Sequence, residues 1–156
     1  MPASPSLRRV APVALLAAVA IPATALAAHP KANGYYYATN AKSQTSVTIG
    51  VVKGKISNGQ ASLRFKKGGK LCAAPGASVA GPVGVSFNIA KHPVAPSSSG
   101  TFSVKTKNAA KDLGRAPITV TGTFTSSKRA TIRVKSSFKG CTGSFATKKA
   151  VYTQGG

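Results

Sequence analysis

This 156-residue chain is poor in the carboxylates and histidines that most often act as general acids and bases. Asp112 is its only acidic residue, and His29 and His92 are its only histidines. Most glycoside hydrolases use two carboxylates, and Mg²⁺ or Ca²⁺ sites are also built on carboxylates, so a single aspartate argues against both. A Ser-His-Asp triad is formally available from His92 and Asp112, but no Gly-x-Ser-x-Gly elbow accompanies them. We therefore expect no catalytic residue, no metal ligand and no cofactor; a hydrolase is the disfavoured alternative.

The chain contains two cysteines, Cys72 and Cys141. In an oxidising compartment an isolated pair most simply forms a disulfide. The bond would close a loop of about 70 residues, which the chain-entropy model equates with roughly 4 kcal/mol of stability. A redox couple or a metal site is the alternative, but the chain has no Cys-x-x-Cys motif.

The N-terminus has the layout of a signal peptide. Arg8 and Arg9 precede an apolar stretch over residues 10–28, which contains the small-x-small sequence Ala25-Leu26-Ala27. We therefore predict a signal peptide over residues 1–27 and a secreted or cell-surface protein. The alternative is an uncleaved N-terminal anchor, although Pro12 and Pro22 interrupt the stretch.

The chain is strongly basic, with 22 Lys and Arg and a formal charge of +21. Removal of residues 1–27 takes away two arginines and leaves +19. Such a surface should attract an anionic cell-wall polymer, an acidic polysaccharide or an acidic lipid surface, unless the charge serves only solubility. No motif indicates a dedicated nucleic-acid reader, and no small-molecule substrate is inferred. The candidate contacts with an anionic polymer are Arg64, Lys66, Lys67, Lys70, Lys105, Lys128, Arg129, Arg133, Lys135, Lys148 and Lys149.

Three consecutive tyrosines, Tyr35, Tyr36 and Tyr37, form a second unusual feature. They cannot all face the core of one strand, so at least one should be exposed. An exposed tyrosine could stack on a sugar ring or a base, which makes a glycan-binding module the alternative function. The more ordinary reading is an edge-strand residue that packs against a neighbour.

Apolar residues alternate with polar ones along most of the chain after residue 46, most regularly over residues 83–89. The pattern predicts an all-β domain over residues 46–156, built as a single antiparallel β-sandwich or partly closed β-barrel of about eight short strands. Residues 28–45 are expected to form a partly disordered segment before it. Asn58-Gly59 is typical of a hairpin turn, and Gly54 of a bulge. The predicted core consists of Val47, Ile49, Val51, Leu63, Phe65, Val83, Val85, Phe87, Ile89, Phe102, Val104, Ile118, Val120, Phe124, Ile132, Val134 and Phe145.

Short motifs in the C-terminal half are similar to those of a known group. They are Gly100-Thr101-Phe102, Ile118 to Phe124, Ala130 to Val134, and Gly140-Cys141-Thr142-Gly143 with Phe145. They resemble the small secreted, disulfide-containing β-domains of high-GC Gram-positive bacteria. The resemblance implies an exported all-β domain with a late cysteine paired to an earlier one, and it implies no activity.

Overall fold

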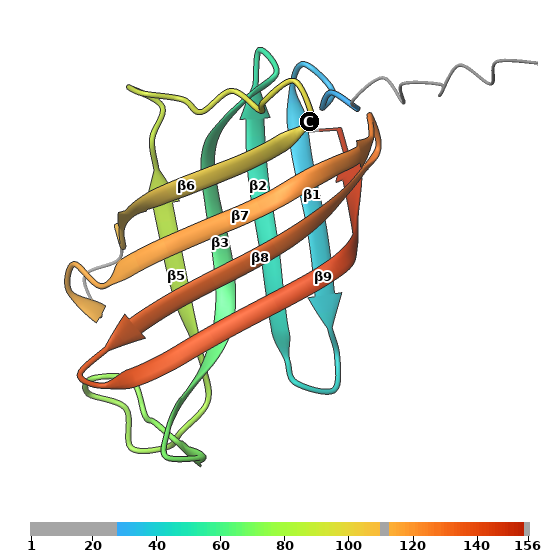
Figure 1. Ribbon diagram of the computed structural model, residues 1–156. Coiled ribbons are helices and arrows are strands. Elements are labelled where there is room, and N and C mark those ends of the chain that lie inside the picture. Colours follow the sequence, from blue (N-terminus) through green and yellow to red (C-terminus); the bar gives the residue numbers. More distant parts are fainter. Residues whose placement is uncertain (1–27, 110–112, 155–156) are drawn as a thin grey trace, which may run out of the picture.

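The chain folds as an all-β domain in two layers that cross each other (Figure 1). The computed structural model describes residues 28–109 and 113–154, so the predicted signal peptide lies outside the described residues. Nine strands and no α-helix occur in the described part of the chain. The strands are β1 (Gly34–Asn40), β2 (Thr45–Val52), β3 (Lys55–Lys67), β4 (Lys70–Leu71), β5 (Pro82–Asn88), β6 (Thr101–Lys107), β7 (Pro117–Ser126), β8 (Arg129–Phe138) and β9 (Cys141–Thr153).

All the strand pairs are antiparallel, and β9 joins the two layers. The front layer in Figure 1 is β6-β7-β8-β9, and the back layer is β1-β2-β3 with β5 paired to β3. The end of β9 pairs with β1, where Tyr152 lies opposite Tyr36. Its beginning pairs with β3, where Gly143 lies opposite Phe65. A single long strand therefore fixes the position of both layers.

The opposite side of the molecule closes through two hydrogen bonds. The Ser86 amide of β5 donates to Asn108 Oδ1 at 2.9 Å, and the Ala109 amide donates to the Ser86 carbonyl at 2.8 Å. This contact links β5 to the segment that follows β6 without forming a continuous ladder. The antiparallel β-sandwich or partly closed barrel predicted from the sequence is confirmed.

The core lies between the two layers, and the alternation of apolar residues predicted it closely. Every residue of the predicted set is buried except Ile89, which is partly buried against the others. Tyr36, Ile56 and Leu113 are also buried, although the pattern of the sequence did not predict it. Tyr36 and Leu113 lie in segments without clear apolar alternation, so the pattern gave no signal for them.

The N-terminal boundary of the domain is corrected. Within residues 28–45, residues 34–40 form β1, which lies between β2 and β9. The three tyrosines obscured this strand, because Tyr35 and Tyr37 point outward and Tyr36 and Ala38 point inward. Because tyrosine, a large residue with an apolar ring and a polar hydroxyl group, occupies all three positions, the sequence shows no alternation of apolar and polar residues there.

The predicted turn at Asn58-Gly59 is also corrected, because both residues lie inside β3. The β2–β3 hairpin instead turns at Lys53 and Gly54, with φ values of 51° and 73°. Positive φ at both central residues is what a tight two-residue hairpin requires. The bulge predicted at Gly54 is wrong in position, because Gly54 lies in this turn and the register shift falls between Gly50 and Val51.

Candidate functional site

The two histidines considered for catalysis lie in exposed segments outside the strands. His92 is exposed in the turn after β5, and His29 is exposed before β1. Asp112 lies outside the described residues. No group of three or more His, Cys, Asp or Glu side chains that could hold a metal ion occurs within residues 28–109 and 113–154. The absence of enzymatic activity stays a prediction.

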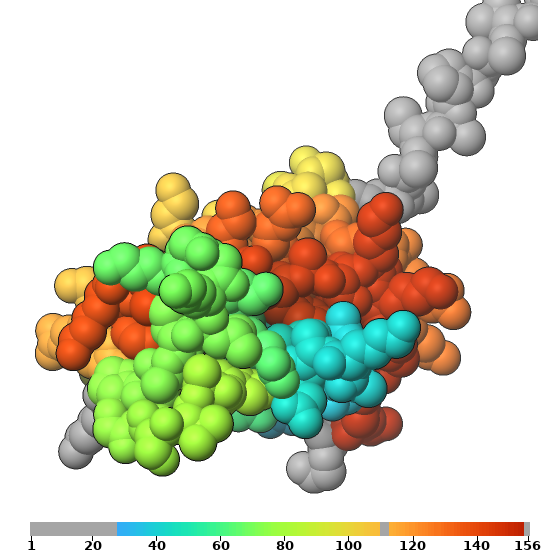
Figure 2. Space-filling model, turned by 90° about the horizontal axis from the view of Figure 1, so that it is seen from below, coloured from blue at the N-terminus to red at the C-terminus, as the bar shows by residue number. Residues whose placement is uncertain are grey.

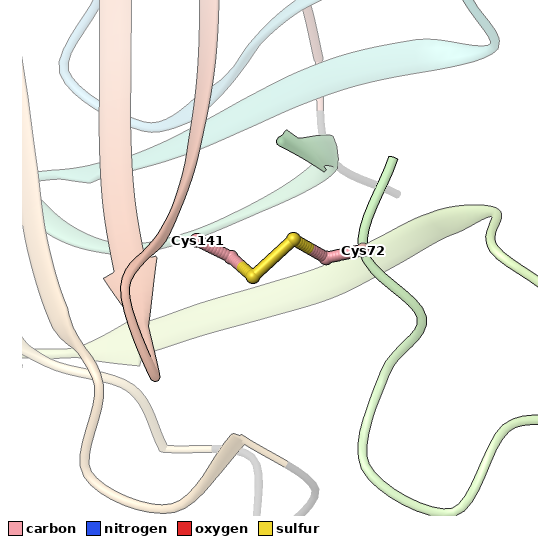
Figure 3. The surroundings of a disulfide bond; sticks show 2 residues. All are labelled: Cys72 and Cys141. Atoms are coloured by element: carbon pink, nitrogen blue, oxygen red, sulfur yellow. A yellow bond between two sulfur atoms is a disulfide. The ribbon is translucent and has the colours of Figure 1, made fainter. Parts of the chain in front are cut away.

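The predicted disulfide is confirmed (Figure 3). It joins Cys72, just after β4, to Cys141, the first residue of β9, with 6.5 Å between the Cα atoms. The Cys72 amide also donates a 2.9 Å hydrogen bond to the carbonyl oxygen of Phe65. The bond therefore ties the chain that leaves β3 to the start of the strand that joins the layers. A structural disulfide is typical of proteins outside the reducing cytoplasm.

The outer surface of the front layer gathers several of the predicted cations. Lys105 on β6 and Lys135 on β8 lie on either side of Thr119 on β7, in one cross-strand row. Arg133 lies two residues before Lys135 and points to the same side, and all three cations are exposed. Strand spacing places Lys105 and Lys135 about 10 Å apart at their backbones, and Arg133 and Lys135 about 7 Å apart. We call Lys105, Lys107, Arg133, Lys135 and Lys148 the cationic face.

The cationic face is hollowed between its charges. An open groove of about 670 Å³ is lined by Thr121 on β7, Thr131 and Arg133 on β8, and Lys148 on β9. Threonine side chains are short, so the two cations flank a groove that is lined in part by threonine hydroxyl groups and in larger part by apolar atoms. Both the ammonium and hydroxyl groups can donate hydrogen bonds to anionic oxygen atoms.

A second group of cations surrounds the disulfide, and we call Lys66, Lys67, Lys70 and Lys139 the lysine corner. Lys67 and Lys70 lie opposite each other across the β3–β4 turn. The Lys67 side chain extends to the β8–β9 turn, because a Cβ placed on Gly140 would lie 3.6 Å from Lys67 Nζ. Figure 2 looks onto this end of the molecule, where the chain that follows β3 (green) lies beside the β1–β2 turn (cyan). Lys139 was not among the predicted contacts, because a single lysine before a glycine is common in polar turns.

The other predicted contacts lie apart from these two groups. Arg64 Nε donates to the Ser43 carbonyl at 2.8 Å, and its NH2 group donates to Gln44 Oε1 at 3.0 Å. Its guanidinium is therefore already engaged by the β1–β2 turn. Lys128 and Arg129 lie at the β7–β8 turn, and Lys149 lies beside the irregular pairing of β8 with β9.

The tyrosine triplet separates into one buried and two exposed side chains. Tyr36 is fully buried, so the prediction that it could stack on a ligand is wrong. Its hydroxyl accepts a 3.0 Å hydrogen bond from the Lys31 amide and donates a 2.8 Å one to the Ser127 carbonyl. Burial raises the pKa of this hydroxyl, although the hydrogen bond from Lys31 opposes the shift. Tyr35 and Tyr37 are 43% and 46% exposed on the outer surface of the back layer.

No family model, curated protein or solved structure matches this chain. The resemblance to secreted bacterial β-domains therefore stays a prediction. No helix in the described residues has the length and apolar character needed to cross a membrane.

Proposed function

We propose that this chain is a non-enzymatic, exported protein that associates electrostatically with anionic polymers of the cell envelope through its cationic face. The observation that carries the proposal is the row that places Lys105 and Lys135 on either side of Thr119, next to Arg133. Their neighbours in this row and the next are serine, threonine and alanine. No carboxylate in either row neutralises the cations.

The charge balance of the chain supports the same conclusion. With one acidic residue in the sequence, the cations of the surface have almost no internal partners. A single exposed charge pair is worth only about 1 kcal/mol in water. A polymer with repeated anionic groups can engage several cations at once, and the second and later contacts form at a high effective concentration. Binding should therefore be strong at low salt and steeply weakened by added salt.

The disulfide and the N-terminal sequence support export. The Cys72–Cys141 bond would be stable in an oxidising compartment. Residues 1–27 have the three parts of a signal peptide, and their removal leaves a domain with a charge of +19. An exported protein of this charge meets the anionic polymers of the envelope as its first large partners.

The test is retention of the purified domain on heparin resin, isolated anionic cell wall and acidic liposomes across a salt series. The variant Lys105→Gln/Arg133→Gln/Lys135→Gln should elute at clearly lower salt than the wild type. The matched control Lys42→Gln/Lys53→Gln/Lys91→Gln removes the same charge from exposed turns. If the wild type is not retained at low salt, the proposal is wrong. Equal weakening by the two variants would contradict the assignment to the cationic face.

A further inference from the structure

The outer surface of the back layer differs in chemistry from the cationic face. Tyr37, Thr48, Gln60 and Ser86 lie side by side in one cross-strand row over β1, β2, β3 and β5. Hydroxyl and amide groups are the polar groups of this row, and none of the four side chains is charged. In a chain with 22 Lys and Arg, this row stands out as a neutral surface.

The neighbouring row extends this surface past the second exposed tyrosine. Tyr35 lies opposite Gly50, and Gly50 lies opposite Asn58. The Asn58 side chain covers Gly50, because a Cβ at that position would collide with the Asn58 amide. The amide is thereby held beside Tyr35. We call Tyr35, Tyr37, Thr48, Asn58, Gln60 and Ser86 the tyrosine face.

The two exposed tyrosines form an apolar border on one side of this face. They are two residues apart on β1, so their Cα atoms are about 7 Å apart. Val151 of β9 lies opposite Tyr37 and is 53% exposed. Two large rings and a valine therefore lie next to a row of hydroxyl and amide groups.

The surface beside the tyrosines is hollowed. One hollow of about 260 Å³ is lined by Tyr35, Gly50 and Asn58, and a second of about 240 Å³ by Tyr35, Asn58, Gln60 and Ser86. A third, of about 370 Å³, shares Gln60 and Ser86 with the second. Neighbouring hollows share lining residues, so they lie side by side across the back layer.

We propose that the tyrosine face binds a segment of a neutral polysaccharide. A sugar ring presents apolar C–H groups on its faces and hydroxyl groups at its edges. Tyrosine rings suit the faces, and the amide and hydroxyl side chains donate to and accept from the edges. An anionic ligand would find no cation among these residues of β1, β2, β3 and β5, and the first cation along the row is Arg129, which lies opposite Val151 of β9.

Self-association through this face is disfavoured by charge. Two copies of a domain with a charge of +19 repel each other because both carry the same large net charge. A neutral polysaccharide brings no such repulsion. The protein would then carry two binding surfaces on opposite layers, one that depends on salt and one that does not.

The test measures retention on insoluble neutral polysaccharides, cellulose and chitin, in 1 M NaCl, where the Debye length is about 3 Å and the cationic face is screened. The wild type should be retained. Each of Tyr35→Ala and Tyr37→Ala should weaken retention about tenfold through loss of ring stacking. The variant Lys105→Gln/Arg133→Gln/Lys135→Gln is the control, and its retention in 1 M NaCl should equal that of the wild type.

Gln60→Ala serves as an independent variant, because Gln60 is exposed and its removal leaves the core intact. It should weaken retention without lowering the melting temperature. Lack of retention of the folded wild type on both polysaccharides would overturn the proposal, as would unchanged retention of the tyrosine variants. A dimer that dissociates in Tyr35→Ala/Tyr37→Ala would also overturn it, because the face would then join two copies. None of these results depends on heparin binding at low salt, so the two proposals fail separately.

Discussion

The Tyr36 hydroxyl group donates a 2.8 Å hydrogen bond to the backbone carbonyl oxygen of Ser127, which lies 91 residues further along the chain. The Tyr36 hydroxyl oxygen in turn accepts a 3.0 Å hydrogen bond from the Lys31 amide. The Tyr36 ring packs edge-on against Phe124 and Tyr152, at centroid distances of 5.0 and 5.6 Å. One side chain of the back layer thus holds both the β7–β8 turn and the segment that precedes β1.

Tyr36→Phe should therefore lower the free energy of unfolding by about 1–2 kcal/mol, because two backbone groups lose their hydrogen-bond partner. Urea denaturation followed by circular dichroism would measure the loss. Tyr37→Phe is the matched control, since Tyr37 is exposed and should change stability by less than about 0.5 kcal/mol. Equal stability of the two variants would contradict the role of the Tyr36 hydroxyl.

The raised pKa of Tyr36 predicts a specific loss of stability at alkaline pH. Tyrosine ionises near pH 10 in the unfolded chain, whereas burial keeps the Tyr36 hydroxyl protonated to higher pH in the folded protein. The stability that this hydroxyl contributes is therefore present below pH 10 and is lost as the pH rises through the folded-state pKa. The stability difference between wild type and Tyr36→Phe should shrink above pH 10. Ionisation of lysine cancels in this comparison, because both proteins carry the same lysines.

The disulfide should account for a large part of the stability of the domain. It closes a loop with a sequence separation of 69, so the variant Cys72→Ser/Cys141→Ser should lose roughly 4 kcal/mol in the chain-entropy model. Thermal and urea denaturation would measure this loss. Thiol titration of the folded, unreduced wild type should detect no free thiol. Two reactive thiols would show that the bond does not form.

Gly122 should not tolerate a larger side chain. A Cβ at this position would collide with the Thr131 carbonyl oxygen and the Phe102 ring. Gly122→Ala should therefore cost about 1–3 kcal/mol through overpacking. Gly84→Ala is the control, because a Cβ on Gly84 would have no neighbour within 4 Å. A similar melting temperature for the two variants would disprove the close packing at Gly122.

Substitution of Ser136 by alanine should increase stability. The serine side chain is 4% exposed, and Oγ has no hydrogen-bond partner in the described part of the chain. Ser136→Ala removes a buried hydroxyl that loses its contact with water on folding, so stability should rise by about 1 kcal/mol. Urea denaturation of the pair would show it. A loss of stability would mean that the hydroxyl is satisfied in solution.

The sequence predicted the central strands because each buries one face. Over residues 83–89, Val83, Val85 and Phe87 point inward and Gly84 and Ser86 outward, so a period of two was visible without the structure. The turn prediction at Asn58-Gly59 was wrong because the same dipeptide favours a tight turn and also fits inside a strand where a neighbouring side chain needs room. The Phe87 ring occupies the space that a side chain at Gly59 would take, and this contact is invisible from local sequence.

The residue types of the candidate sites could be predicted from the sequence. The arrangement of these residues on the strands could not. The cationic residues and the tyrosines were named from the sequence, but the positions of the cationic face and the tyrosine face on opposite layers depend on which strands pair. The row from Lys105 through Thr119 to Lys135 requires β6, β7 and β8 to be neighbours in a fixed register. The register of paired strands is set by turns and bulges. The register shift between Phe124 and Ser126 could not be predicted from the sequence.

The contact of Ser86 with Asn108 and Ala109 affects the tendency of the protein to aggregate. A sheet with two free edges offers unpaired amide and carbonyl groups to other copies and can seed aggregates. Here part of the β5 edge is occupied by the segment that follows β6, and β5 begins at Pro82, which has no amide hydrogen to offer. Lys105 and Lys107 place charge along β6, the other edge of the sheet. Both edges are thus protected against strand addition, which limits aggregation between copies of the domain.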